Sequence, residues 1–252
     1  MLTMRRRIAR LSRRDGVRQI ALVLVAVGAY ELARVAIEPN WPAAMANARR
    51  IAELERSLAL GFEREVQDAF LAIPDLVKAL NVFYFVGHFL LTGIFFVWLF
   101  HRSRDGFRSF RDGFLVATAL AMLVHWQFPT APPRLADDQI LDTLRTLSGI
   151  DIGSRASTAL SNPVFAVPSL HAGYAAGVGL GLLAFGRRAA TRVLGVLYPA
   201  VVTLTIIVTG NHFLFDAIAG VLVMALGFLA VGAVRRWQKR RQDTPVPAVA
   251  SR

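Results

Sequence analysis

Apolar runs of membrane-spanning length constrain this chain more than any other feature. They recur along its 252 residues, 55% of which are hydrophobic. The hydrocarbon core of a bilayer is about 30 Å thick, which a helix of about 20 apolar residues crosses. A lipid-exposed span must satisfy its own backbone hydrogen bonds, and a single apolar run does so as a helix. The sequence therefore predicts an all-α integral membrane protein with a bundle of six transmembrane helices, at residues 19–37, 76–100, 113–128, 169–185, 193–208 and 212–234.

The predicted six-span membrane domain covers residues 19–237. A basic arm precedes it at 1–18, and a tail that we expect to be disordered follows at 238–252. Between the first two spans, in residues 43–73, apolar side chains such as Ile51 recur at steps of three and four with charged residues between them. This pattern predicts an amphipathic helix in the membrane interface. A helix packed against the bundle, with no role in chemistry, is the alternative.

The basic residues are unevenly distributed among the connections. Twenty of the 29 lysines and arginines lie in the N-terminal arm, the second and fourth connections and the C-terminal arm. Short connections rich in lysine and arginine remain in the cytoplasm. We therefore expect a multi-pass plasma-membrane protein with both termini in the cytoplasm. The net charge of +12 is an orientation signal and not a nucleic-acid patch. The absence of cysteine excludes disulfides and a cysteine nucleophile.

The first span carries two charged residues, Glu31 and Arg34, within an otherwise apolar run. A basic arm, an apolar run and the small residues that follow it also resemble a cleavable signal peptide. The length of the run and its charges favour a retained anchor.

Two short polar motifs lie at the predicted outer ends of spans. The first is PSLHAGYA, at residues 168–175. Proline is tolerated in the first helical position, so we expect Pro168 to open a helix. Ser169, Leu170 and His171 then lie at its N-terminus. Unpaired N–H groups and the helix dipole make such a terminus an anion-binding position, although the motif is also compatible with a simple helix cap.

The second motif, VTGNHFLFDAIAG at residues 208–220, contains a histidine and an aspartate four residues apart. With Asn211 as the N-cap, His212 would lie in the first turn and Asp216 on the same helical face. A carboxylate that binds one imidazole nitrogen fixes the tautomer and leaves the other nitrogen available as base or nucleophile. Taken alone, such a pair at a helix start more often serves in capping or packing than in catalysis.

A third element, WQFPTAPPRL, follows the third predicted span and presents Arg134 just outside it. A guanidinium binds phosphate through two parallel hydrogen bonds, while an interfacial anchor is the alternative role. These groups all fall at outer span ends, and ionisable groups at membrane depth are costly enough to be functional candidates. We therefore assign one site to Arg134, Ser169, His171, His212 and Asp216.

The remaining histidines are less informative. His88 lies within the second span and His125 near the outer end of the third, so each either faces the site or makes an interhelical hydrogen bond. His101 lies among cytoplasmic arginines, where we expect it to be solvated. One further alternative is a zinc site made of His125, His171, His212 and Asp216. Their spacing is not a recognised ligand pattern, so we expect no metal and no other cofactor.

In this order, the motifs resemble those of the type 2 phosphatidic acid phosphatase superfamily, and more narrowly its inositol phosphorylceramide synthase-like branch. The superfamily motifs are Lys-x6-Arg-Pro, Pro-Ser-Gly-His and Ser-Arg-x5-His-x3-Asp. Arg134 matches the arginine of the first motif. Residues 168–171 match the second, with leucine in place of glycine as in that branch, and His212 and Asp216 match the end of the third.

The chain also departs from these motifs. Gln127 occupies the lysine position and Leu135 the proline position of the first motif, and Thr205 and Ile206 replace the serine and arginine of the third. Two cations that usually bind the phosphate are thus absent, which favours the synthase-like branch over plain phosphatidic acid phosphatase activity. Candidates for additional phosphate contacts are Gln127, His125 and Lys78.

By this resemblance, His212 attacks phosphorus to form a phosphohistidine, supported by Asp216. His171 protonates the leaving alcohol and later activates the acceptor, while Arg134, Ser169 and the backbone amide of Leu170 hold the phosphoryl oxygens. The resemblance implies a metal-independent enzyme that cleaves a phospholipid or polyprenyl phosphate at the outer leaflet.

Whether that enzyme is a hydrolase or a transferase depends on its acceptor, which is water or an alcohol. The motifs do not separate the two reactions, because both share the same intermediate. The non-enzymatic alternative is a lipid or polyprenyl-phosphate flippase or binding protein that uses the same anion-binding groups.

Overall fold

The computed structural model describes residues 15–16, 18–19, 21–22, 25–26, 28–150 and 163–243. In these residues every regular element is helical, as predicted, apart from an isolated bridge between Thr130 and Phe165. The described part of the first predicted span is helical at residues 28–36. The long helices are α5 (His88–Arg102), α6 (Arg104–Gln127), α10 (Leu170–Phe185), α11 (Ala189–Val208) and α12 (Leu214–Asp243).

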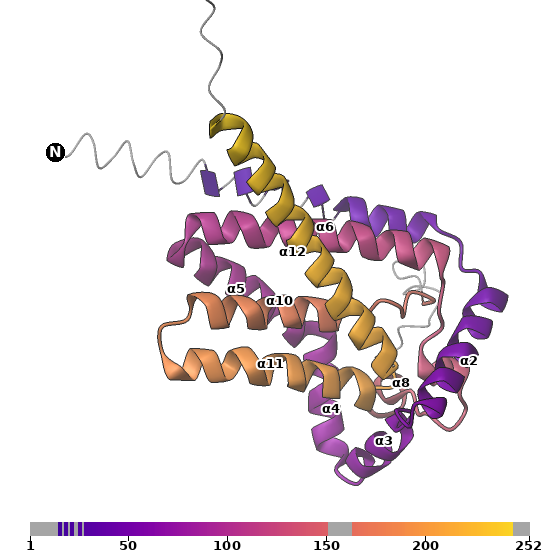
Figure 1. The fold of residues 1–252 in the computed structure, drawn as a ribbon. Helices are drawn as coiled ribbons and strands as arrows, with labels where there is room; N and C mark the ends of the chain where they lie inside the picture. Colours follow the sequence, from indigo (N-terminus) through magenta and orange to yellow (C-terminus); the bar gives the residue numbers. More distant parts are fainter. Residues whose placement is uncertain are drawn as a thin grey trace, which may run out of the picture.

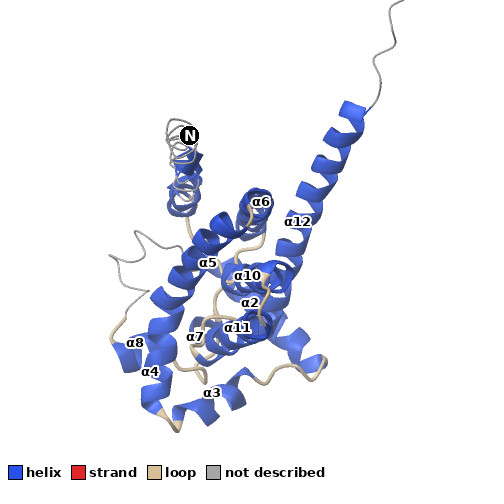
Figure 2. Ribbon diagram, turned by 90° about the vertical axis from the view of Figure 1, so that its left-hand side faces the viewer, coloured by secondary structure: helices blue, strands red, loops and turns tan. Residues whose placement is uncertain are grey.

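Helix α10 lies at the centre of the bundle and packs against α5, α6, α11 and α12 (Figure 2). Helix α12 crosses α10 and α6 obliquely, as Figure 1 shows. Helices in a membrane associate through close packing of small residues rather than through the hydrophobic effect. The glycines of α10 serve this purpose, because a Cβ on Gly173 would lie 2.8 Å from the carbonyl oxygen of Gly220. At this point the backbone of α10 therefore packs directly against the backbone of α12, with no side chain between them.

Among the described residues, three helical segments are long and apolar enough to cross a membrane. They are Pro74–Arg102, Ala189–Val208 and Leu214–Gln242, and Leu170–Phe185 is a shorter apolar helix. The first of them comprises α4 (Pro74–Val82), a π-helical turn η1 (Phe83–Gly87) and α5. The chain is thus a membrane protein by its apolar helices, while the count of six spans stays a prediction.

Several predicted boundaries are corrected. The second connection is reduced to Ser103, which caps α6 by accepting a hydrogen bond from the Gly106 amide at 3.1 Å. Helix α6 therefore begins nine residues before the predicted start at 113. Helix α12 continues to Asp243, so residues 238–243 of the predicted tail are helical. The remainder of the tail, and most of the arm at 1–18, lie outside the described residues.

The single amphipathic helix predicted at 43–73 is instead two helices, α2 (Trp41–Ser57) and α3 (Glu63–Leu71). The break falls at Ala59, whose φ of 56° is left-handed. The apolar residues are not uniformly buried, since Leu58 is 59% exposed while Glu55 is 2% exposed. The buried face of these helices therefore combines apolar residues such as Ile51 with the carboxyl groups of Glu55 and Glu63, which accept hydrogen bonds from backbone amides at the start of α12 (Leu214–Asp243). Short helices α7 (Pro133–Ala136) and α8 (Thr143–Ser148) complete this end of the molecule.

Candidate active site

His212 and Asp216 meet at the start of α12. The helix begins at Leu214, so His212 precedes it, and the prediction of Asn211 as the N-cap is wrong. One carboxylate oxygen of Asp216, Oδ2, accepts from the Phe213 amide at 3.0 Å and lies 3.2 Å from His212 Nδ1. The aspartate thus turns back onto the residue before the helix, as in a capping box. Its bond to Nδ1 leaves Nε2 as the reactive nitrogen of His212.

His171 is the second residue of α10. The N-cap of this helix is Ser169, whose Oγ accepts from the Ala172 amide at 3.4 Å. Pro168 therefore precedes the cap and does not open the helix as predicted, because the serine hydroxyl satisfies a first-turn amide. The His171 ring centroid lies 6.0 Å from that of His212. Its Nε2 is buried, with no hydrogen-bond partner among the described residues.

Two backbone contacts hold these histidines close together. The Ser169 amide donates to the Asp216 carbonyl at 2.9 Å, which joins the start of α10 to the first turn of α12. A Cβ on Gly220, one turn further along α12, would lie 2.0 Å from the Ser169 carbonyl oxygen. Only glycine allows the two helices to approach so closely.

Arg134 is anchored beside the loop that carries His212. Its Nε donates to Asn211 Oδ1 at 2.9 Å, its amide donates to the Gly210 carbonyl at 3.0 Å, and its guanidinium lies 3.5 Å from Asp142. Gly210 has a φ of +69°, and a Cβ there would lie 3.2 Å from the Arg134 Cβ. The arginine side chain is only 5% exposed. Its position is therefore set by the same loop that positions the histidine.

A cavity of about 1120 Å³, hereafter the catalytic cavity, joins these groups. Of the residues predicted from the sequence, those that line it are Arg134, Leu170, His171, His212 and His125. Ser169 and Asp216 are fully buried behind them. Three segments far apart in the sequence, at 125–134, 169–171 and 212–216, thus converge on one space.

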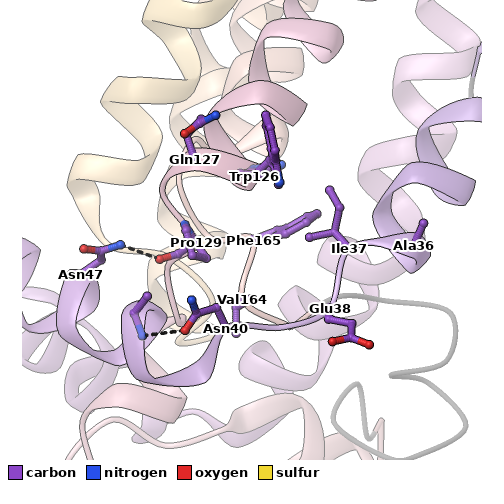
Figure 3. Close-up of a pocket in the computed structure, with 12 residues that line it drawn as sticks. Ala36, Ile37, Glu38, Asn40, Asn47, Trp126, Gln127, Pro129, Val164 and Phe165 are labelled. Carbon is purple, nitrogen blue, oxygen red and sulfur yellow. Dashed lines mark hydrogen bonds between the residues drawn. The ribbon is translucent and has the colours of Figure 1, made fainter.

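Two predicted auxiliary residues lie elsewhere. Gln127 is exposed at the end of α6 and lines a second pocket of about 490 Å³, together with Glu38 and Asn40 (Figure 3). Lys78, on α4, is half exposed and paired with Asp75 at 2.9 Å. Neither residue is among those that line the catalytic cavity.

The other two histidines inside the bundle lie near the site. His88 Nδ1 is 2.8 Å from the Tyr198 hydroxyl, an interhelical contact, and its ring lies 5.0 Å from that of His171. His125 Nε2 is 3.1 Å from the Pro168 carbonyl. His88 therefore makes the predicted interhelical contact and is not among the residues that line the catalytic cavity. His101, expected to be solvated, is exposed but lines the far end of the cavity.

Tyr84 is a site residue that sequence reasoning missed. It belongs to the π-helical turn η1, and its ring stacks on His171 with centroids 4.3 Å apart and an interplanar angle of 15°. Such turns frequently occur at functional sites. Nothing in the sequence predicts this turn, so Tyr84 has no sequence signal.

Arg34 was also missed as a site residue. It lines the catalytic cavity together with His171 and His125. Its guanidinium lies 3.4 Å from the Glu31 carboxylate, which is a long hydrogen bond. A signal was present in the sequence, because a charged residue inside an apolar run is costly and marks a functional position.

Two buried carboxyl groups on α2 and α3 also went unrecognised. Glu55 Oε1 accepts from the Phe215 amide at 2.6 Å, and Glu63 Oε1 accepts from the Leu214 amide at 3.0 Å. Burial raises the pKa of Glu55 to about 8, with the hydrogen bond from Phe215 opposing the shift and the charge of Glu63 adding to it. With Asp216, these residues cap the first amides of α12 and so fix the loop before it.

The described part of the chain contains no group of three or more histidine, aspartate or glutamate side chains arranged to hold a metal ion. The zinc alternative therefore has no geometric support in these residues. The groups present are those of acid–base and nucleophilic chemistry on an anion: a histidine fixed by a carboxylate, a second histidine and a buried arginine.

One family matches most of the chain. The model described as the PAP2 superfamily matches residues 49–230. The match includes Arg134, His171, His212 and Asp216, whereas Arg34 precedes it. No curated protein and no solved structure matches the chain.

Proposed function

Because the chain belongs to the PAP2 superfamily, whose members are generally phosphatase-type enzymes, we propose that it is a metal-independent lipid phosphatase or phosphotransferase. The observation that carries this proposal is the contact between His212 Nδ1 and Asp216, in a cavity that also contains His171 and Arg134. A histidine fixed in this way can attack an electrophile through Nε2. The substrate is a phosphoester lipid, with a phospholipid or a polyprenyl phosphate as the candidates.

In the first step, His212 Nε2 forms a bond to phosphorus and the bond from phosphorus to the leaving oxygen breaks. His171 donates a proton to that oxygen, and the product is a phosphohistidine and a free alcohol. In the second step, His171 removes a proton from water or an acceptor alcohol, whose oxygen then attacks phosphorus and releases His212. General acid–base catalysis of this kind contributes about 10²- to 10⁴-fold to the rate.

The phosphoryl oxygens are held by Arg134 and by the first backbone amides of α10, beginning at Leu170. These amides precede the first intrahelical hydrogen bonds and lie at the positive end of the helix dipole. Arg34 supplies a second cation from the first span. Ser169 acts by capping α10 and by holding Asp216 through its amide.

The synthase-like branch is favoured by the residues that replace the superfamily cations. Ile206, at the position of the arginine in the third motif, is fully buried in an apolar cluster. Gln127, at the lysine position, lies in the second pocket. From the distribution of arginines, we place the site on the extracytoplasmic side of the plasma membrane.

The direct test is purified His212→Ala protein assayed with phosphatidic acid and with polyprenyl phosphates. We expect it to keep the helical circular dichroism of the wild type and to lose phosphate release and phosphate transfer. A flippase or binding protein does not need the imidazole, so turnover or transport at the wild-type rate would contradict the proposal.

A second measurement separates this chemistry from metal catalysis. Vanadate, which mimics a phosphoryl group in transfer, should inhibit the enzyme, and a chelator should not. Loss of activity with the chelator, restored by a divalent metal, would favour a metal enzyme instead.

A further inference from the structure

The catalytic cavity does not end at the catalytic residues. It continues away from His212 between the helix of the first span, α5 and α6. Its middle section is lined mainly by apolar side chains and one glycine: Phe89, Gly93, Phe96, Val97, Phe114 and Leu115. At the opposite end it reaches His101 and Arg111. We call this extension the trough.

The trough is longer than one leaflet of a bilayer. Along α5 and the turn before it, the lining runs from Phe85 to His101. At a rise of 1.5 Å per residue, this stretch is about 24 Å long. Half of a hydrocarbon core about 30 Å thick is about 15 Å. A lipid chain confined to one leaflet would therefore fill only part of the trough.

The ends of this space carry basic side chains, whereas its middle is apolar. Arg34 and Arg134 lie at the catalytic end, where an anionic head group would meet His212. The middle offers aromatic and aliphatic walls, which favour a hydrocarbon chain because burying apolar surface is favourable. The ligand that matches both is an amphiphile with a phosphate head and a long chain.

We propose that the trough binds the hydrocarbon chain of the substrate, and that this substrate is a lipid phosphate whose chain is longer than one leaflet. This inference rests on the proposed function, since the phosphate must lie at His212 for the chain to enter the trough. The trough then selects among lipid phosphates by length, while the catalytic residues act on the phosphate that all of them share.

Gly93 allows the trough to be filled without disturbing its surroundings. A Cβ at this position would meet no atom within 4 Å, so Gly93→Leu narrows the middle of the trough. Gly28, on the first span, is equally open but is not among the lining residues, which makes Gly28→Leu the matched control. Gly93→Ala narrows the trough less than Gly93→Leu does, and it can be measured if Gly93→Leu does not fold.

The experiment measures binding of polyprenyl monophosphates of increasing chain length to the full chain in detergent, by native mass spectrometry. For the wild type and Gly28→Leu, we expect affinity to rise with length until the trough is full. The preference for long chains is measured as the ratio of the short-chain Kd to the long-chain Kd. Gly93→Leu should reduce this ratio by about tenfold. A wild-type affinity that does not depend on length, or an unchanged preference in both Gly93 variants, would overturn the inference.

Measuring both binding and turnover distinguishes an error in the trough assignment from an error in the proposed catalysis. If phosphate is released from lipids of every length at the same rate and with the same affinity, the trough assignment is wrong and the proposed function stands. If binding depends on length and on Gly93 but no lipid is cleaved, the trough binds the chain and the proposed catalysis is wrong.

Discussion

The rings of His171 and His212 lie 6.0 Å apart although they belong to segments separated by 40 residues. Their separation is fixed by backbone rather than by side chains, because the Ser169 amide binds the Asp216 carbonyl directly. The proposed acid–base residue and the proposed nucleophile are therefore held by one contact between α10 and α12. Any change that separates these two helices should separate the two histidines as well.

Gly220→Ala tests this coupling. The added methyl group would lie 2.0 Å from the Ser169 carbonyl oxygen, so α10 must move away. We expect kcat to fall by about 100-fold, the loss that a misplacement of about 1 Å can cause. Gly232→Ala on the same helix is the control, since its new Cβ would meet only the Arg236 side chain at 3.4 Å. Steady-state phosphate release at the wild-type rate from Gly220→Ala would show that the contact is not needed.

The positions of the main site residues were predictable because they depend on local patterns. Arg134, His171 and His212 line one cavity, as their positions at span ends indicated, with Asp216 buried behind His212. The exact helix starts were not predictable. Asp216 binds the Phe213 amide and so begins α12 two residues later than a cap at Asn211 would suggest.

The supporting residues depend on contacts that no local pattern reveals. Glu55 reaches an amide 160 residues away, and its neighbours on α2 resemble those of an ordinary surface helix. The apolar periodicity of the segment 43–73 correctly indicated helix. It could not show that Glu55 and Glu63 would face the protein, because their burial depends on the backbone amides of α12 that they cap.

Asp216→Asn tests whether Asp216 orients the imidazole of His212, because this substitution leaves the imidazole itself in place. The carboxamide introduced by this substitution can donate toward Nδ1 of His212, which would favour the tautomer with its proton on Nε2. Nε2 would then lack the lone pair that attacks phosphorus. We expect kcat to fall by about 100-fold or more, within the range of general acid–base and orienting groups, with little change in KM. A loss confined to KM would assign Asp216 to substrate binding instead.

Arg34→Gln tests the second cation of the phosphate site. Removal of a charge that binds substrate and transition state equally raises KM and leaves kcat unchanged. We expect an increase in KM of about tenfold, and partial recovery in Arg34→Lys, which keeps the charge but loses the planar fork. Lys78→Gln is the control, because Lys78 is half exposed and pairs with Asp75. A greater effect from Lys78→Gln than from Arg34→Gln would reverse the assignment.

Glu55 should make the stability of the protein depend on pH. Its pKa is about 8 in the folded protein, against an ordinary value of 4.5. Between these values the unfolded chain releases the proton while the folded protein keeps it, so stability falls as pH rises from about 4.5 to about 8. Glu55→Gln keeps an oxygen for the Phe215 amide and cannot ionise. Thermal unfolding in detergent should therefore show a smaller loss of Tm across this range for Glu55→Gln than for the wild type. Glu53→Gln, exposed on the same helix, should behave as the wild type does. An equal pH dependence in wild type and Glu55→Gln would mean that Glu55 is ionised in the folded protein.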